Sequence, residues 1–304
     1  MNSLPLIISP LVKRALEQGS AVLALESTVI THGLPYPDNL EALAMLEESA
    51  REHGATPATI CLLDGVFHIG LDGSALELLT HKLLAGEPLQ KLAYRDLAMA
   101  VAQKSSGGTT VSATMYLAYL AGIKVFSTGG IGGVHRNWQS SLDISLDIKA
   151  LATIPTLVVC AGCKAILDIP ATMEVLESAG VPVYGWQTDE FPSFYSRRSG
   201  ISISKLDSLS AIAEAFRIHR SLSLISGGML IANPIPQEFE IPTEIIEPFI
   251  QRAIEDAKGI SGKELTPFLL ANIAEITKSK SVEANLALLK NNVILGAKIA
   301  GEMT

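Results

Sequence analysis

Short apolar runs alternate with amphipathic segments along this chain, and that alternation limits its fold more than any other feature. The runs at 123–130, 155–162 and 181–188 have the apolar content of buried strands, and each ends in glycine or polar residues. Between the last two lies a segment with helical spacing, 164–180. Because a strand–helix–strand order joins parallel strands through helices that cover the sheet, we predict an α/β fold. We expect three layers, α/β/α, with a largely parallel or mixed central sheet and a helical C-terminal segment.

The other expected elements extend this pattern over the whole chain. A helix should begin near Asp38, and the pair Asp64-Gly65 predicts a hairpin turn within 58–70. No internal repeat or clear linker interrupts the pattern, so we predict a single domain over residues 1–304. The remaining elements are expected as strands at 21–30, 200–206 and 226–236, and as helices at 39–55, 73–86, 94–105, 110–121, 208–222 and from 242 onward.

Charge and composition exclude several classes of protein. The net charge is 23 − 31 = −8, which disfavours a general nucleic-acid or anionic-membrane surface but allows one phosphorylated small molecule in a positive pocket. No window approaches ~18 consecutive apolar residues, so we expect no membrane span. The apolar N-terminus is short and broken by Pro5 and Pro10, which argues against a signal peptide. Three cysteines, an odd and low number, predict reduced thiols in a cytoplasmic protein.

Chemically versatile residues follow three of the expected strands. They are Glu26-Ser27-Thr28, the segment 128–136 and the segment 160–164. Ligands of doubly wound sheets bind at the carboxyl ends of the strands, so these three segments form the candidate site. The loop DEFPSFYSRRSG, 189–200, carries aromatic and arginine side chains that suit an active-site loop.

The glycine-rich segment GGIGGVHR matches neither common phosphate-binding motif. His135 stands where the dinucleotide fingerprint needs its third glycine, and the segment lacks the G-K-[ST] of a P-loop. Its backbone N–H groups can still converge on an anion, with His135 and Arg136 directly behind them. We expect an anion or substrate contact here; the alternative is a tight turn that permits close packing.

The stretch CAGCK, 160–164, poses a choice between thiol and amine chemistry. A redox pair would need its first thiol exposed at a helix N-terminus, and a structural zinc site would need a second Cys/His pair that the chain lacks. We therefore expect Cys160 and Cys163 to be buried packing residues. Lys164 is expected where the strand end becomes a helix, and a partly desolvated lysine there can attack a carbonyl; a solvated lysine at a helix start is the alternative.

Two carboxylate positions complete the candidate chemistry. Glu26 lies in an apolar segment, so we expect it either to be paired or to have a raised pKa, which suits a general acid; the alternative is a buried glutamate that caps a helix. Asp143 and Asp147 are spaced to share one face of a helix or strand, and two carboxylates can hold Mg²⁺ or Mn²⁺. Carboxylates that cap a helix would give the same pattern.

The combination is far more specific than any single motif. In order along the chain, the motifs are ALESTVITHGLPYPDN, GGTTVSATM, VFSTGGIGGVHR, DISLD, VVCAGCKAILDIPATMEVLESAGVPVYGWQTDEFPSF and GGMLIANPIP. Together they resemble the pseudouridine-5′-phosphate glycosidase family, also called indigoidine synthase A-like. The resemblance covers nearly the whole chain from about residue 6. Some relatives have CAGAK where this chain has CAGCK, which also argues that the two cysteines are not needed as a pair.

The resemblance implies a function, a cofactor and a set of residues. The reaction is the reversible cleavage of the C–C glycosidic bond of pseudouridine 5′-phosphate to uracil and ribose 5-phosphate, in a Mn²⁺-dependent enzyme that is usually a homotrimer. The nucleophile falls on Lys164, the proton donor on Glu26 and the metal ligand on Asp143. The substrate contacts fall on Lys91, Thr110, Val111, His135, Ser145, Leu146, Asp147 and, for the base, Asn285.

Two alternatives remain at this point. One is a sugar-phosphate lyase or aldolase that uses the same lysine imine on a different substrate. The other is a protein that binds or senses a sugar phosphate without catalysis, although the presence of Glu26, Lys164 and Asp143 argues against it.

Overall fold

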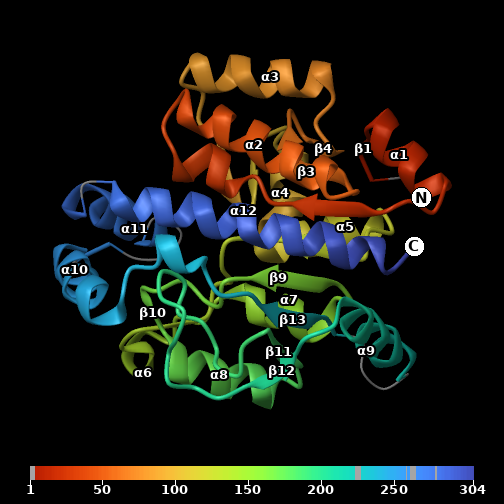
Figure 1. Ribbon diagram of the computed structural model, residues 1–304. Coiled ribbons are helices and arrows are strands. Elements are labelled where there is room, and N and C mark those ends of the chain that lie inside the picture. The colour runs from red at the N-terminus through yellow and green to blue at the C-terminus, as the bar shows by residue number, and fades with distance from the viewer. Residues whose placement is uncertain (1–3, 223–226, 258, 261–264, 278) are drawn as a thin grey trace.

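The fold is built around one broad, twisted sheet that lies between layers of helices (Figure 1). The computed structural model describes residues 4–222, 227–257, 259–260, 265–277 and 279–304. Within them the main sheet has eleven strands. These are β1 (Leu6–Ile8), β2 (Val22–Leu25), β3 (Thr56–Leu63), β4 (Val66–Ile69), β5 (Gln90–Leu92), β6 (Gly107–Thr109), β7 (Val125–Ser127), β9 (Leu157–Cys160), β11 (Val183–Trp186), β12 (Ser204–Leu206) and β13 (Met229–Ala232).

The strands run β1-β4-β3-β2-β7-β9-β13-β11-β12 across the sheet, with β6 paired to β3 and β5 paired to β6. From β3 through β2, β7, β9, β13 and β11 to β12, every neighbouring pair is parallel. The predicted hairpin joins β3 to β4 in antiparallel register, and both turn residues, Asp64 and Gly65, have the positive φ that such a tight turn requires. A separate two-stranded ribbon pairs β8 (Val134–His135) with β10 (Leu167–Asp168).

Helices cover both faces of the sheet, as predicted. They are α1 (Pro10–Glu17), α2 (Asp38–Glu52), α3 (Gly73–Leu84), α4 (Leu97–Ala102), α5 (Val111–Leu120), α6 (Trp138–Ser141), α7 (Leu146–Thr153), α8 (Ile169–Ser178), α9 (Leu209–Ser221), α10 (Thr243–Asp256), α11 (Leu265–Ile276) and α12 (Lys280–Gly301). Short helical turns occur at η1 (Val29–Gly33, a π-helix), η2 (Tyr94–Asp96) and η3 (Gln237–Phe239). None of the described helices combines the length and the apolarity that crossing a membrane requires.

The long helix α12 anchors one face of the sheet. It crosses β2, β7 and β9 and lies beside α2, while α5 and α7 pack on the opposite face (Figure 1). Its side chains Leu288, Val293 and Ile299 are fully or almost fully buried, and each such burial stabilises the fold by about 1.5–3 kcal/mol. The C-terminal helix therefore fixes the ends of the strands that carry the candidate site.

Several predicted boundaries were wrong. The strand expected at 21–30 ends at Leu25, and the polar residues after it turn into the π-helix η1. The expected helix 94–105 is a 3₁₀ turn followed by the short helix α4, and strands β1, β5 and β6 and helix α1 were not predicted. Residue 226 of one expected strand, and residues 258, 263, 264 and 278 of the expected C-terminal helices, lie outside the described residues.

The most consequential correction concerns Lys164. The helix expected over 164–180 begins at Ile169, because Asp168 caps it by accepting a hydrogen bond from the Ala171 amide at 3.0 Å and Pro170 occupies its first turn. Lys164 therefore lies in the connection between β9 and α8, not in the first turn of a helix.

Candidate active site

The candidate site lies at the carboxyl edge of the parallel strands, as predicted. Glu26 directly follows β2, Thr128 directly follows β7, Lys164 lies in the connection after β9 and Asn233 directly follows β13. Since these four strands are neighbours in the sheet, their ends bring residues that are far apart in sequence into one cleft.

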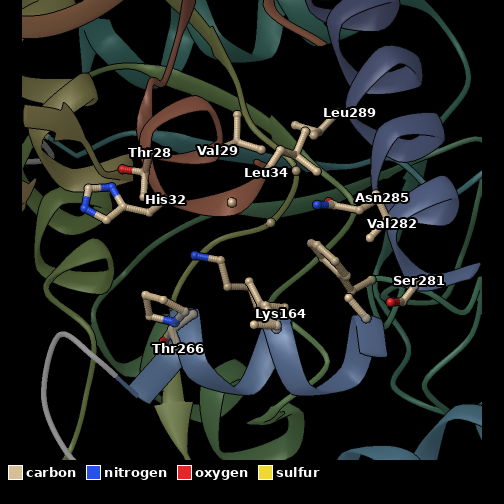
Figure 2. Close-up of a pocket in the computed structure, with 18 of the residues that line it drawn as sticks. Thr28, Val29, His32, Leu34, Lys164, Thr266, Ser281, Val282, Asn285 and Leu289 are labelled. Atoms are coloured by element: carbon tan, nitrogen blue, oxygen red, sulfur yellow. The ribbon is translucent and has the colours of Figure 1, made fainter. Parts of the chain in front are cut away.

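A first pocket contains Glu26, Lys164 and the proposed base contact Asn285. Figure 2 shows Lys164 between Thr28 and the following turn η1 with His32, the helix α11 that carries Thr266, and the helix α12 that carries Asn285 and Leu289. The cavity volume is about 120 Å³ in this pocket and about 770 Å³ in the second pocket beside it. The lining consists of Glu26, Thr28, Val29, His32, Gly33, Leu34, Lys91, Gly129, Gly130, Lys164, Phe194, Tyr195, Thr266, Pro267, Leu270, Ala271, Ala274, Ser281, Val282, Asn285 and Leu289.

A second pocket adjoins the first and contains most of the predicted phosphate and metal residues. Lys91, Lys164 and Thr266 line both pockets, so the two lysines stand where they meet. The other predicted residues that line the second pocket are Thr110, His135, Asp143, Ser145, Leu146 and Asp147. The exposed cations Arg95 and Lys149 also line it. The predicted acid and the predicted nucleobase contact thus line the first pocket, and the predicted sugar-phosphate contacts line the second. Lys91 and Lys164 line both.

Val111 is the one predicted contact that lines neither pocket. It is the first residue of α5 and its side chain is 1% exposed, so a ligand could reach it only through its backbone. Its neighbour Thr110 is half-buried and does line the second pocket.

Burial determines the chemistry of Glu26. Desolvation raises the pKa of its carboxyl group above the usual 4.5, while the positive charge of Lys164 and a hydrogen bond from the Thr128 hydroxyl act in the opposite direction. The net effect is a raised pKa, as expected for a general acid. Within the described part of the chain, Glu26 caps no helix: its side chain accepts a hydrogen bond from Thr128, at the end of β7.

Backbone hydrogen bonds hold the segment that carries Lys164. The chain after β9 runs alongside the glycine loop: the Ile131 amide donates to the Gly162 carbonyl and the Lys164 amide donates to the Ile131 carbonyl, both at 3.1 Å. Gly162 has a φ of +86°, and a Cβ atom there would overlap the carbonyl oxygen of Pro192. The glycine loop therefore positions the lysine segment.

The carboxylate of Asp147 is already engaged by the protein. It accepts hydrogen bonds from the amides of Ser112 at 3.0 Å and Gly132 at 2.8 Å, one on each oxygen, and the residue is 5% exposed. The Gly132 amide, which was expected to face a substrate anion, thus binds an internal carboxylate instead. Each oxygen of Asp147 already accepts one backbone hydrogen bond, so of the two carboxylates Asp143 is the more available metal ligand.

The side chain of Arg136 lines neither pocket. Its guanidinium donates to both carboxylate oxygens of Glu247 on α10, at 2.5 and 3.0 Å, and to the Ala165 carbonyl at 3.1 Å. The expectation that Arg136 would contact an anion from behind the glycine loop is corrected: this side chain ties the loop to α10 and to the residue after Lys164.

His135 and Asp143 form a loose pair at the rim of the second pocket. The His135 Nε2 and Asp143 Oδ2 atoms are 4.0 Å apart, and the His135 amide donates to the Asp143 carbonyl at 3.0 Å. Burial lowers the pKa of His135, the Asp143 carboxylate acts against that effect, and the charges of Lys164 and Lys91 add to it. Among the described residues, no group of three or more His, Cys, Asp or Glu side chains could hold a metal.

The cysteines are packing residues, as predicted. Cys61, Cys160 and Cys163 are free thiols with no exposed surface, and burial raises the pKa of each to about 12. A thiolate nucleophile or ligand needs a lowered pKa, so the burial of both cysteines argues against thiol chemistry at the CAGCK stretch.

Several residues of the site were missed. His32, Thr266 and Ser281 line the first pocket and were not predicted as site residues, whereas Thr128, which donates to Glu26, belongs to the predicted segment 128–136. The loop 189–200, predicted as an active-site loop, does supply Phe194 and Tyr195 to the first pocket.

A family model and several known proteins match nearly the whole chain. A family model described as "Indigoidine synthase A like protein" matches residues 11–302. The pseudouridine-5′-phosphate glycosidase of Paracoccus denitrificans is 49% identical over 303 residues, covering 98% of this chain and 99% of that protein. An indigoidine synthase A-like protein from Thermotoga maritima has a structure that superposes with a TM-score of 0.90 at 34% identity, covering 100% of this chain and 98% of that one. The prealnumycin C-glycosynthase AlnA, solved in complex with ribulose 5-phosphate, also superposes with a TM-score of 0.90, at 32% identity and with 99% and 98% coverage. This chain therefore belongs to the indigoidine synthase A-like family.

Proposed function

We propose that this protein is a pseudouridine-5′-phosphate glycosidase that cleaves the C–C glycosidic bond to give uracil and ribose 5-phosphate, reversibly. The observation that carries the proposal is that Lys164 and a Glu26 of raised pKa line one pocket, with Asn285 on its wall. Relatives with full-length similarity to this chain bear that name. The solved relative AlnA, whose name describes C-glycoside synthesis, holds a five-carbon sugar phosphate.

The chemistry requires both an acid and a nucleophile. The leaving uracil departs as carbon and must be protonated on carbon, which requires a positioned acid; Glu26 fills that role. Ring opening breaks the C1′–O4′ bond and leaves an electrophilic C1′; the uncharged Lys164 amine adds there, and the proton that the amine loses balances the one that O4′ takes up. The C1′–C5 bond then breaks while C5 takes the proton of Glu26, and the lysine remains joined to the sugar as an imine. Water hydrolyses the imine, which releases ribose 5-phosphate and restores the amine.

The second pocket suits the sugar phosphate. Ser145 caps α7, whose N-terminus lies at this pocket and carries the partial positive charge that favours a phosphate. Lys91 adds a full positive charge where the two pockets meet. Phosphate binding at this end would orient C1′ toward Lys164, and His135 and Thr110 would contact the same part of the ligand.

The first pocket suits the base. Asn285 offers both an amide donor and an acceptor, which match the N–H and C=O edge of uracil. Apolar side chains such as Val29, Leu34 and Phe194 would cover the ring faces.

Asp143 is a suitable ligand for the expected Mn²⁺. It is a half-buried carboxylate at the rim of the phosphate end, beside His135, and one carboxylate fits an oxygen-preferring ion that keeps several waters and substrate oxygens. When bound, the ion would supply positive charge to orient and polarise the sugar phosphate. A homotrimer and a cytoplasmic location are further predictions from the resemblance and the reduced cysteines.

A trapping experiment tests the function. The protein is incubated with pseudouridine 5′-phosphate and Mn²⁺, borohydride is added, free uracil is followed and any adduct is mapped by mass spectrometry. We expect uracil release and a reduced ribose-phosphate adduct on Lys164. Uracil release without an adduct would refute the imine but not the reaction. An adduct from ribose 5-phosphate alone, with no cleavage of the nucleotide, would support a sugar-phosphate lyase or a binding protein instead.

A further inference from the structure

Thr128 contacts the carboxyl group of Glu26, and the role derived for it here rests on the proposed function of Glu26. Thr128 is 1% exposed and directly follows β7. Its hydroxyl donates a hydrogen bond to Oε1 of Glu26, which directly follows the neighbouring strand β2. A hydroxyl has one proton to give, so this bond commits it.

The backbone of Thr128 is fixed by two hydrogen bonds. Its amide donates to the Val159 carbonyl at 3.0 Å, and its carbonyl accepts the side-chain amide of Asn292 at 2.9 Å. Asn292 is fully buried in α12 and accepts in turn from the side chain of Asn233 at 3.0 Å. A chain of hydrogen bonds thus runs from Asn233 after β13 through Asn292 and Thr128 to the carboxyl group of Glu26 after β2.

The two oxygens of Glu26 are consequently different. Oε1 accepts from Thr128, whereas no described residue donates a hydrogen bond to Oε2. In a protonated carboxyl group, the oxygen that accepts a hydrogen bond is the carbonyl oxygen and the other carries the proton. We propose that Thr128 is the positioning residue of the acid: by donating to Oε1 it directs the transferable proton of Glu26 to Oε2 and fixes the plane of the carboxyl group.

The proposal accounts for the proton throughout the reaction. Oε2–H gives its proton to C5 of the departing uracil, and the carboxylate that remains keeps its hydrogen bond from Thr128. The charged groups that act on Glu26 are Lys164 from the connection after β9, Lys91 from β5 and Asp147 from α7. Because Thr128 stabilises the ionised form, it also opposes the effect of burial on Glu26.

Two substitutions and a matched control test the proposal. Thr128→Val removes the donor with little change in shape, and Thr128→Ser keeps it. Thr59→Val is the control, because Thr59 is also a fully buried threonine that donates to a glutamate, Oε1 of Glu47 at 2.8 Å, outside both pockets. All variants are first compared with wild type by circular dichroism and thermal unfolding.

Activity gives the first readout. We expect Thr128→Val to lower kcat about 10- to 100-fold, a fraction of what a general acid contributes, and to move the alkaline limb of the rate profile to higher pH. Thr128→Ser should keep kcat and the alkaline limb close to those of wild type. Thr59→Val should lower stability without shifting the alkaline limb of the rate profile. A Thr128→Val profile that matches Thr59→Val would overturn the proposal.

A titration without substrate separates this inference from the proposed function. The Glu26 carboxyl is followed by ¹³C NMR in labelled protein, with Glu26→Gln to assign its signal. In Thr128→Val the pKa of Glu26 should rise relative to wild type, whether or not pseudouridine 5′-phosphate is the substrate. An unchanged titration would contradict the inference, while a shifted titration in a protein that releases no uracil would contradict only the function.

Discussion

Arg136 binds Glu247 through two guanidinium nitrogens, at 2.5 and 3.0 Å, and so joins the glycine loop to α10. Bidentate pairs of this kind are stronger than single contacts, and this one also reaches the Ala165 carbonyl beside Lys164. The pair therefore links the stability of a peripheral helix to the position of the proposed nucleophile.

The first prediction follows from this pair. Arg136→Gln and Glu247→Gln, alone and together, should show a coupling of about 1 kcal/mol in urea unfolding at pH 7, after allowance for partial solvent exposure. Arg136 lowers the pKa of Glu247 below 4.5, so the coupling should be complete above that pH and disappear as the pH falls through the lowered value. The exposed pair Lys205 and Asp207, at 3.1 Å, is the control and should couple weakly. A coupling that survives at pH 2 would show that charge is not its origin.

The second prediction distinguishes backbone strain from steric overlap as the reason why residue 162 is glycine. Gly162→Ala must accommodate both a φ of +86° and a Cβ that overlaps the Pro192 carbonyl, whereas Gly180→Ala meets only the strain of φ +70° with nothing within 4 Å. We expect Gly180→Ala to cost about 1 kcal/mol with normal turnover. Gly162→Ala should cost at least about 3 kcal/mol and lose most activity, because the Lys164 segment is displaced. Equal unfolding free energies for the two variants would contradict the proposed overlap.

The third prediction distinguishes charge from nucleophilicity at Lys164. Lys164→Arg keeps a cation in the pocket but offers no amine, so uracil release should fall at least about 10³-fold while ribose 5-phosphate still binds. Lys91→Ala should instead raise KM more than it lowers kcat, since the charge of Lys91 is proposed to bind the phosphate. Substantial turnover by Lys164→Arg would exclude the imine.

The broad fold was predictable because its signals are local. Buried parallel strands such as 155–162 are continuous apolar runs, and the Asp64-Gly65 turn has the residue types that its backbone requires. The strands β5 and β6 were missed because Gln90–Leu92 and Gly107–Thr109 have no apolar periodicity and pair only through contacts distant in sequence. The start of α8 could have been read from Asp168 and Pro170, which are ordinary N-terminal signals.

The site was predictable in its residue types but not in its hydrogen bonds. Glu26 and Lys164 stood out as polar residues at the ends of apolar runs, and parallel pairing then required them to share an edge. No local pattern could tell that Asp147 is held by Ser112 and Gly132, because these contacts depend on how α5 and α7 pack.

The fourth prediction concerns the buried thiols. At pH 8 a thiol with a pKa of about 12 is ionised to only roughly 10⁻⁴, and all three cysteines are fully buried, so native protein should resist iodoacetamide. Three alkylated cysteines should appear by mass spectrometry after denaturation. Replacement of Cys160 and Cys163 by alanine should lower the melting temperature but preserve uracil release. Rapid alkylation of one cysteine in the native protein, or activity that requires a reductant, would restore a thiol role.

The last prediction places the metal. Asp143→Ala should abolish Mn²⁺ activation of uracil release and weaken Mn²⁺ binding measured by electron paramagnetic resonance in the presence of ribose 5-phosphate, because Asp143 is a half-buried carboxylate at the phosphate end whose nearest ionic partner, His135, is 4.0 Å away. Asp147→Asn is the informative comparison. Its side chain accepts from two backbone amides, and an asparagine there would turn an NH₂ group toward one of them, so stability should fall by about 1–3 kcal/mol. Mn²⁺ activation should persist in whatever fraction of Asp147→Asn remains folded, since both oxygens of Asp147 are directed at backbone amides. Loss of Mn²⁺ binding in folded Asp147→Asn, with binding retained in Asp143→Ala, would move the metal to Asp147.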